Sequence, residues 1–165
     1  MSAPMIGIMM GSDSDHTVMA EAFGVLDALN ISYEFLVASA HRTPDRVRDF
    51  VRKAEGQGTK VFIAGAGGAA HLAGVVAGET LRPVIGVPLN SALNGIDSVL
   101  STVQMPKGVP VATVAIGKAG AYNAALLAAE ILALSDLDLA SRLKSFREKM
   151  SAEVAEKSKR IGGLP

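Results

Sequence analysis

Short apolar runs alternate with segments of helical periodicity along the first 134 residues of the chain. Apolar runs that fit strands cover residues 5–10, 33–38, 60–64, 84–87 and 111–115, with Pro88 ending the fourth. Segments with apolar positions at helical spacing cover residues 15–29, 44–57 and 121–134, and shorter helices are expected up to residue 80 and over 96–101. This alternation predicts an α/β fold with three layers, α/β/α. Its doubly wound parallel five-stranded sheet should have the flavodoxin-like order 2-1-3-4-5.

The last thirty residues follow a different pattern. Beyond Asp136, a narrow apolar stripe runs along an otherwise charged segment, at Leu139, Leu143, Phe146, Met150 and Val154. Such a stripe predicts a long helix that packs either on its own domain or on a neighbouring subunit. We therefore expect a single α/β domain over residues 1–165, with a core of residues 1–134. Residues 135–165 should form a C-terminal helical extension at subunit interfaces.

Composition excludes several classes of function. The 165 residues include 16 basic and 16 acidic side chains, so the chain lacks the positive charge of a nucleic-acid or membrane-surface binder. There is no cysteine, which removes disulfides and thiol chemistry. Residues 1–4 have no charged start of a signal peptide, and no apolar run is long enough to span a bilayer. We expect a cytoplasmic protein.

Polar residues follow the first two strands, at the sheet edge where parallel strands end and ligands bind. Ser12 and Asp15 begin a helix, where hydroxyls and free N–H groups suit a phosphate and a carboxylate suits sugar hydroxyls. Simple helix capping explains each of them equally well. The second strand is followed by Ser39, His41 and Arg42. Histidine is a residue type that can titrate near neutral pH, and the planar guanidinium of arginine can bind a phosphate with two hydrogen bonds. Residue 43 is expected to cap the helix that follows. A solvated turn is the alternative for this loop.

A glycine-rich turn follows the third strand. Residues 65–68 (Gly-Ala-Gly-Gly) match neither a dinucleotide fingerprint nor a P-loop, and a tight strand-to-helix connection would explain them. In the expected strand order, however, this turn and His71 lie beside the first two loops. Together, the three loops predict a pocket for a small phosphorylated molecule, with a histidine for proton transfer. A zinc site is a competing interpretation, which we do not favour because His16 is expected to face elsewhere.

Four segments closely resemble the N5-carboxyaminoimidazole ribonucleotide mutase family of purine biosynthesis, and the resemblance extends over nearly all of residues 1–134. They are residues 11–15 (Gly-Ser-Asp-Ser-Asp), 39–44 (Ser-Ala-His-Arg-Thr-Pro), 65–72 (Gly-Ala-Gly-Gly-Ala-Ala-His-Leu) and 104–117, which begins Gln-Met-Pro-Lys-Gly. The resemblance implies an isomerase that moves a carboxylate from the exocyclic nitrogen of a phosphoribosyl aminoimidazole to ring carbon C4. It also implies a homo-octamer, with no cofactor and no metal.

The resemblance assigns roles to individual residues. It makes His41 the general acid and base. It places substrate contacts at Ser12 and Asp15 in the first loop, at Ser39 and Arg42 in the second, and at Gly67 and His71 in the third. Two residues depart from the family pattern, His16 in place of tryptophan and Ala73 in place of proline. Both adjoin the loops of the predicted site, so loop shape and substrate affinity are the properties they would alter.

Three alternative functions remain open. A phospho-receiver domain needs an acceptor aspartate at the end of the third strand, where this chain has Ala64 and Gly65. A flavin carrier would be expected to hold the flavin between aromatic side chains, which make up only 4% of the residues. A carboxylase that uses CO2 directly belongs to the same family. Residues 104–117 resemble the bacterial mutase branch, which favours the mutase.

Overall fold

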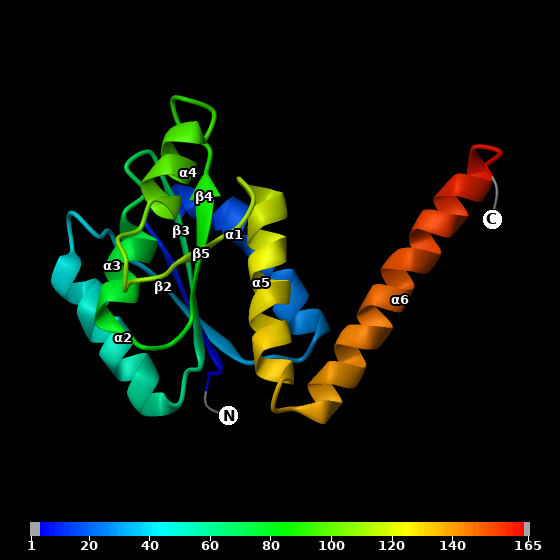
Figure 1. The fold of residues 1–165 in the computed structure, drawn as a ribbon, viewed down its shortest axis with the longest axis horizontal. Helices are drawn as coiled ribbons and strands as arrows, with labels where there is room; N and C mark the ends of the chain where they lie inside the picture. The colour runs from blue at the N-terminus through cyan, green and yellow to red at the C-terminus, as the bar shows by residue number, and fades with distance from the viewer. Residues whose placement is uncertain (1–3, 164–165) are drawn as a thin grey trace.

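The computed structural model describes residues 4–163, in which a five-stranded sheet lies between helices on both faces (Figure 1). The sheet order is β2-β1-β3-β4-β5 and every pairing is parallel, as the sequence predicts. The strands are β1 (Ile6–Met10), β2 (Tyr33–Val37), β3 (Val61–Gly67), β4 (Val84–Leu89) and β5 (Ala112–Thr113). The helices are a 3₁₀ turn, η1 (Asp13–Asp15), then α1 (His16–Ala28), α2 (Pro44–Gln57), α3 (Leu72–Glu79), α4 (Ile96–Val103), α5 (Lys118–Ala133) and α6 (Leu137–Arg160).

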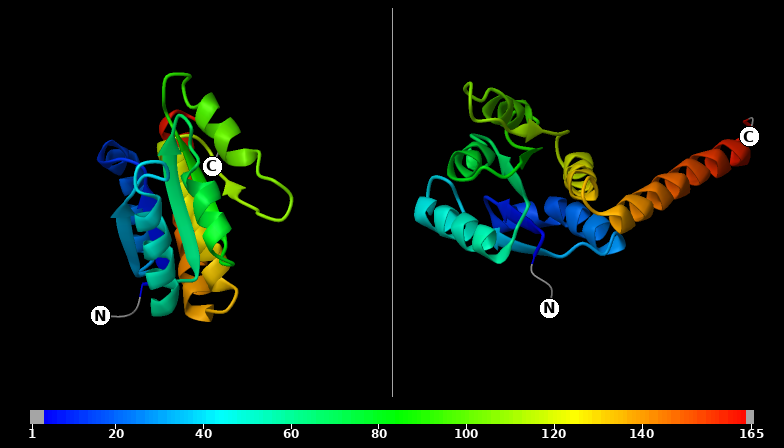
Figure 2. Two further views of the ribbon diagram at one scale, coloured as in Figure 1. Left: turned by 90° about the vertical axis from the view of Figure 1, so that its left-hand side faces the viewer. Right: turned by 60° about the horizontal axis from the view of Figure 1, so that its bottom comes forward.

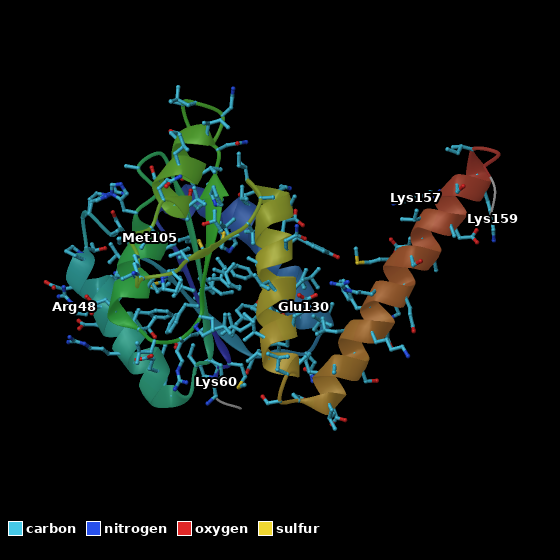
Figure 3. All side chains as sticks on the ribbon, in the orientation of Figure 1. Arg48, Lys60, Met105, Glu130, Lys157 and Lys159 are labelled. Atoms are coloured by element: carbon cyan, nitrogen blue, oxygen red, sulfur yellow. The ribbon has the colours of Figure 1, made fainter. Side chains whose placement is uncertain are left out.

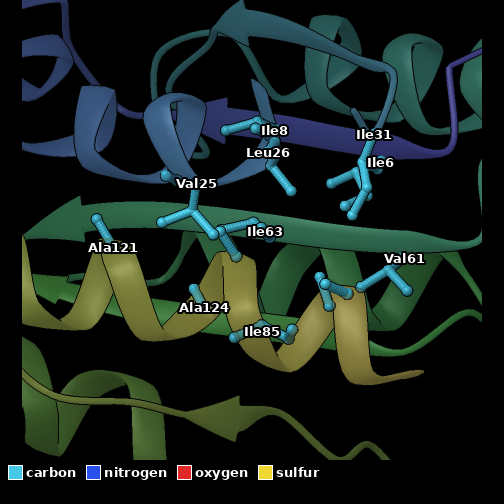
Figure 4. Close-up of a cluster of buried hydrophobic side chains, with 14 of the residues drawn as sticks. Ile6, Ile8, Val25, Leu26, Ile31, Val61, Ile63, Ile85, Ala121 and Ala124 are labelled. Atoms are coloured by element: carbon cyan, nitrogen blue, oxygen red, sulfur yellow. The ribbon is translucent and has the colours of Figure 1, made fainter. Parts of the chain in front are cut away.

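The core consists of two apolar clusters, one on each face of the sheet. Because side chains alternate along a strand, Ile8 of β1 belongs to one cluster and its neighbour Met9 to the other. Figure 4 shows part of the first cluster, where Ile63 lies near Val25 of α1 and Ala124 of α5. The second cluster joins the opposite face to α2 and α3. Both faces are therefore buried, which explains why the inner strands are continuous apolar runs.

The apolar run at residues 33–38 predicts a buried strand, but β2 is only partly buried, which corrects that interpretation. β2 is an edge strand, and the Phe35 side chain is 50% exposed. An edge strand has a neighbour on one side only, so its apolar side chains need not be covered within the chain.

Pro88 does not end β4, which is a second correction. Pro88 pairs with Ala66, and β4 continues to Leu89. Proline is tolerated here because β5 flanks β4 only at Ile85 and Gly86. Beside Pro88 no strand lies on the β5 side of β4. The N–H that proline lacks would therefore have no strand partner there. The carbonyl of Pro88 accepts a hydrogen bond from the Gly117 N–H instead.

The glycine-rich turn extends β3 rather than following it. The strand was expected to end at Ala64, but Gly65 and Gly67 continue the pairing with β4, while β5 is shorter than its apolar run. In consequence the candidate site lies at the ends of β3 and β4 together.

α6 leaves the domain after its first turns (Figures 1 and 2). Asp136 caps it by accepting a hydrogen bond from the Leu139 N–H at 2.9 Å, and Leu139 and Leu143 are buried in the first cluster. Farther along, Met150 and Val154 are 42% and 66% exposed. Figure 3 shows the far half, with Lys157 and Lys159, well away from the sheet. None of the helices formed by residues 4–163 is both long and apolar enough to cross a membrane.

The chain ends fall partly outside these residues. Residues 1–3 and 164–165 lie outside the described part of the chain, so the expectations about the first four residues and about the end of the C-terminal extension reach beyond it.

Candidate active site

A cavity of about 530 Å³ lies at the carboxyl ends of β1, β2, β3 and β4. All seven of the site residues predicted from the sequence line it: Ser12, Asp15, Ser39, His41, Arg42, Gly67 and His71. A larger hollow, about 860 Å³, lies between the end of α1 and the start of α6, but its lining contains no histidine. Its arginine, Arg142, already donates a hydrogen bond to the carbonyl of Leu29. The smaller cavity is therefore the candidate active site.

The first loop both caps a helical turn and faces the cavity. The Ser12 N–H donates to the Asp15 carboxylate at 2.9 Å, and the Ser14 N–H donates to the Ser12 hydroxyl at 3.4 Å, which together form a capping box. Burial raises the pKa of Asp15, while backbone hydrogen bonds from Ser12 and Gly11 act in the opposite direction. The capping and binding interpretations are thus compatible, because one carboxylate oxygen is enough for the cap.

The second loop is a hydrogen-bonded turn that presents His41 and Arg42. The Ser39 N–H donates to the Thr43 hydroxyl at 2.9 Å, and this hydroxyl donates back to the Ser39 carbonyl at 3.1 Å. Thr43 therefore does not cap α2 with its side chain, contrary to expectation; its hydroxyl is used within the turn. Among residues 4–163, no carboxylate forms an ion pair with Arg42, so its guanidinium remains available for an anion.

The two histidines of the cavity are hydrogen-bonded to each other. His41 Nε2 lies 2.8 Å from His71 Nδ1, and the rings meet edge to face with centroids 4.9 Å apart. The bond requires one proton between these two nitrogens, so the tautomer of one ring sets that of the other. When His41 is protonated, His71 accepts from it. The pair therefore holds one proton between the two rings, and both rings line the cavity.

α4 holds the glycine-rich turn in place. Ser98 is fully buried; its hydroxyl accepts from the Gly68 N–H at 2.9 Å and donates to the Leu89 carbonyl at 2.7 Å. Gly68 has a φ of +66°, a conformation that favours glycine. A Cβ at Gly67 would lie 3.4 Å from the Asn90 carbonyl oxygen, so close packing against β4 is one reason for glycine there. The sequence did not indicate this role of α4, because serine in a short helix has no distinctive pattern.

Asn90 and Ser91 also line the cavity, and the sequence analysis missed them. They follow β4, as most of the other site residues follow β1, β2 or β3. The same rule, that ligands bind at the carboxyl ends of parallel strands, would have found them had β4 been extended past Pro88.

The histidines are not arranged as a zinc site. His16 begins α1, and its ring packs against Phe23 and Phe35, with centroids 5.6 and 6.1 Å away. It is therefore separate from the His41–His71 pair. In residues 4–163, no three histidine or carboxylate side chains are grouped closely enough to hold a metal ion.

Comparison with known proteins identifies the family. The family model described as AIR carboxylase matches residues 5–153. The chain belongs to this family. The N5-carboxyaminoimidazole ribonucleotide mutase of Bacillus subtilis is 57% identical over 159 residues, covering 96% of this chain and 98% of its own length. The protein of the same name from Escherichia coli K12 is 54% identical over 152 residues, covering 92% and 90%.

A solved structure of the family shares the fold. The crystal structure of Treponema denticola PurE superposes with a TM-score of 0.86 at 31% identity, covering 96% of this chain and 98% of that one. Family membership thus agrees with the fold and with the resemblance found in the sequence.

Proposed function

We propose that the protein is an N5-carboxyaminoimidazole ribonucleotide mutase, an isomerase of purine biosynthesis. The observation that carries this proposal is the 57% identity, over almost the whole chain, to a relative named for that activity. A receiver or flavin-carrier function has no comparable support. We place the enzyme, by inference, in the cytoplasm.

The reaction moves one carboxylate and returns every proton it uses. Protonation of the carbamate nitrogen allows the N–C bond to break, which releases CO2 beside the aminoimidazole. Carbon C4 then attacks CO2 and forms the new C–C bond. Loss of the C4 proton restores the aromatic ring. One histidine can deliver the first proton and remove the second, since its ordinary pKa lies near the operating pH. We assign this role to His41, with His71 accepting from it at 2.8 Å.

The remaining site residues bind and enclose the substrate in this proposal. Arg42 offers a two-pronged donor to the phosphate, with the Ser12 and Ser39 hydroxyls beside it. Asp15 accepts hydrogen bonds from the ribose hydroxyls. The small residues of the third loop, including Gly67, form a wall that keeps CO2 close to C4.

Direct carboxylation is the second candidate, because the matching family model is described as AIR carboxylase. One assay separates the two reactions. The mutase should convert the N-carboxylated nucleotide without added bicarbonate and should act poorly on the uncarboxylated nucleotide unless CO2 is raised. Efficient use of the uncarboxylated nucleotide at ambient CO2 would identify a carboxylase instead.

A further inference from the structure

Ser91 and Asp97 form a hydrogen-bonded pair at the β4 side of the cavity. Ser91 lines the cavity in the loop after β4, and its hydroxyl donates to Asp97 Oδ2 in the first turn of α4. The other carboxylate oxygen, Oδ1, is buried and has no hydrogen-bond partner among residues 4–163. A buried acceptor without a partner costs stability, so its presence beside the cavity calls for an explanation.

The pairing fixes what the Ser91 hydroxyl can recognise. A serine hydroxyl has one proton and two lone pairs. Because its proton is held by Asp97, the Ser91 oxygen can only accept hydrogen bonds from a ligand in the cavity. A group of the substrate that contacts it must therefore carry an N–H or O–H.

The strand order indicates which part of the nucleotide lies near Ser91. Arg42 follows β2, Asp15 follows β1 and Ser91 follows β4, at the other side of β3. If Arg42 holds the phosphate and Asp15 the ribose, as proposed above, the base extends toward β3 and β4, where His41 meets His71. One ring nitrogen of that base is glycosylated and the other is an acceptor. Its exocyclic nitrogen is consequently its only N–H donor.

We propose that Ser91, oriented by Asp97, accepts a hydrogen bond from the exocyclic nitrogen of the aminoimidazole. This inference rests on the proposed function and adds a specificity-determining residue to it. Ser91 touches the substrate, whereas Asp97 is a positioning residue that acts through Ser91. The contact holds the nitrogen that loses the carboxylate, and so keeps C4 facing the released CO2.

The test compares two nucleotides on full-length variants. Calorimetry measures the binding of the carboxylated product and of the same nucleotide without its exocyclic amine. Ser91→Ala should weaken product binding about tenfold, equivalent to ~1.4 kcal/mol, and leave binding of the amine-free nucleotide unchanged. Ser91→Thr, which keeps the hydroxyl, should retain most of the affinity. Ser135→Ala, which removes a hydroxyl bonded to the Leu132 carbonyl far from the cavity, is the matched control.

Asp97 is tested by a double-mutant cycle. Asp97→Ala should weaken product binding less than Ser91→Ala does, and it should have no further effect in the Ser91→Ala background. Equal losses for both nucleotides, unchanged binding, or additive losses would each overturn the inference. Wild-type conversion of the N-carboxylated substrate is measured alongside. Its absence would refute the proposed function, whereas normal conversion with unaffected variants would refute only the role of Ser91.

Discussion

His41 and His71 share a single proton between Nε2 and Nδ1, so their chemical roles are linked although only one need transfer protons to the substrate. Because this bond needs one proton between the two rings, a change of tautomer in one ring requires a matching change in the other.

His41→Asn should abolish nearly all activity while leaving the fold intact. Asparagine keeps the approximate size but cannot exchange a proton at neutral pH. General acid–base catalysis contributes about 100- to 10,000-fold, and a group used twice belongs at or beyond the upper end. His71→Asn should reduce kcat less, by about 100-fold.

Turnover, product affinity and melting temperature of both variants check this prediction. Product binding should persist in His41→Asn. If that variant keeps more than about a tenth of the wild-type kcat, a barrier change of only ~1.4 kcal/mol, His41 is not the proton shuttle.

Asp15 illustrates how a binding site reduces stability. Burial raises its pKa, so the folded chain holds a proton more tightly than the unfolded chain does. At a pH below the ordinary pKa of aspartate, Asp15 is protonated in both the folded and the unfolded state. Its burial then does not lower the free energy of unfolding. As the pH rises through the raised folded-state pKa, the unfolded state gains more from ionisation, and the free energy of unfolding falls.

Asp15→Asn should therefore stabilise the protein at neutral pH and weaken binding. The asparagine carbonyl can still accept from the Ser12 N–H, so the cap is kept. Denaturant unfolding should show an advantage over wild type near pH 7 that shrinks toward pH 4. Product affinity should fall about ten- to a hundredfold with the loss of a charged acceptor. A destabilised variant at pH 7 would contradict this account.

At this scale the sequence was most informative where polar residues directly follow a strand. Residues such as Ser39 and Arg42 could be placed at the cavity because the ends of parallel strands meet at one edge. Ser91 could not, because Pro88 hid the true end of β4. The hydrogen bond between His41 and His71 was also beyond prediction, since side-chain directions depend on the packing of two separate turns.

α4 shows how one short helix positions a loop to which it is not adjacent in the sequence. Ser98 joins the backbone of the glycine-rich turn to the end of β4. The buried Thr102 hydroxyl donates to the Ser98 carbonyl at 2.7 Å and lies 3.3 Å from the Ala70 carbonyl oxygen. The turn leads directly to His71. Its position relative to His41 therefore depends on buried hydroxyl groups.

Ser98→Ala should impair both stability and catalysis. It leaves the partly buried Gly68 N–H and the buried Leu89 carbonyl without their partner, which costs about 1–3 kcal/mol. Thr59→Val is the matched control, because Thr59 is also fully buried and its hydroxyl donates to the Pro4 carbonyl at the opposite end of the sheet. Both variants should lose stability, but only Ser98→Ala should lower kcat by about tenfold or more. Equal kcat values for Ser98→Ala and Thr59→Val would show that Ser98 contributes only to stability.

The bounds of helices and strands were predicted well where one hydrophobic periodicity dominated. The burial of the strand at the edge of the sheet was predicted less well. α2 matches its expected bounds because Pro44 begins it and Gly58 ends it in a left-handed conformation. β2 was expected to be buried because its residues are apolar, although the predicted order 2-1-3-4-5 already placed it at an edge of the sheet. There Phe35 is half exposed.

Residues 4–163 expose apolar side chains in several places, and two of these places are helix faces. One is the far half of α6; the other is the outer face of α4, where Ile96, Leu100 and Val103 lie on successive turns. Exposed stripes of this kind are typical of contacts between protein chains. Together with the sequence resemblance, they favour an oligomer, and we expect an octamer.

Light scattering at micromolar concentration should give the mass of the oligomer, and a monomer would refute this prediction. Val154→Glu should shift the population toward smaller species, because a buried valine contributes about 1.5–3 kcal/mol and the carboxylate adds a desolvation cost. Glu153→Gln, its exposed neighbour, is the control and should leave the mass unchanged.

The projection of α6 also bears on the fate of a subunit before assembly. An isolated helical segment of a few turns is only marginally stable in water. In an unassembled chain, the far half of α6 should therefore fray and present Met150 and Val154 to solvent, and lose this exposure once another surface covers it. In the expected oligomer, proteases should therefore cleave this helix more slowly than in unassembled chains.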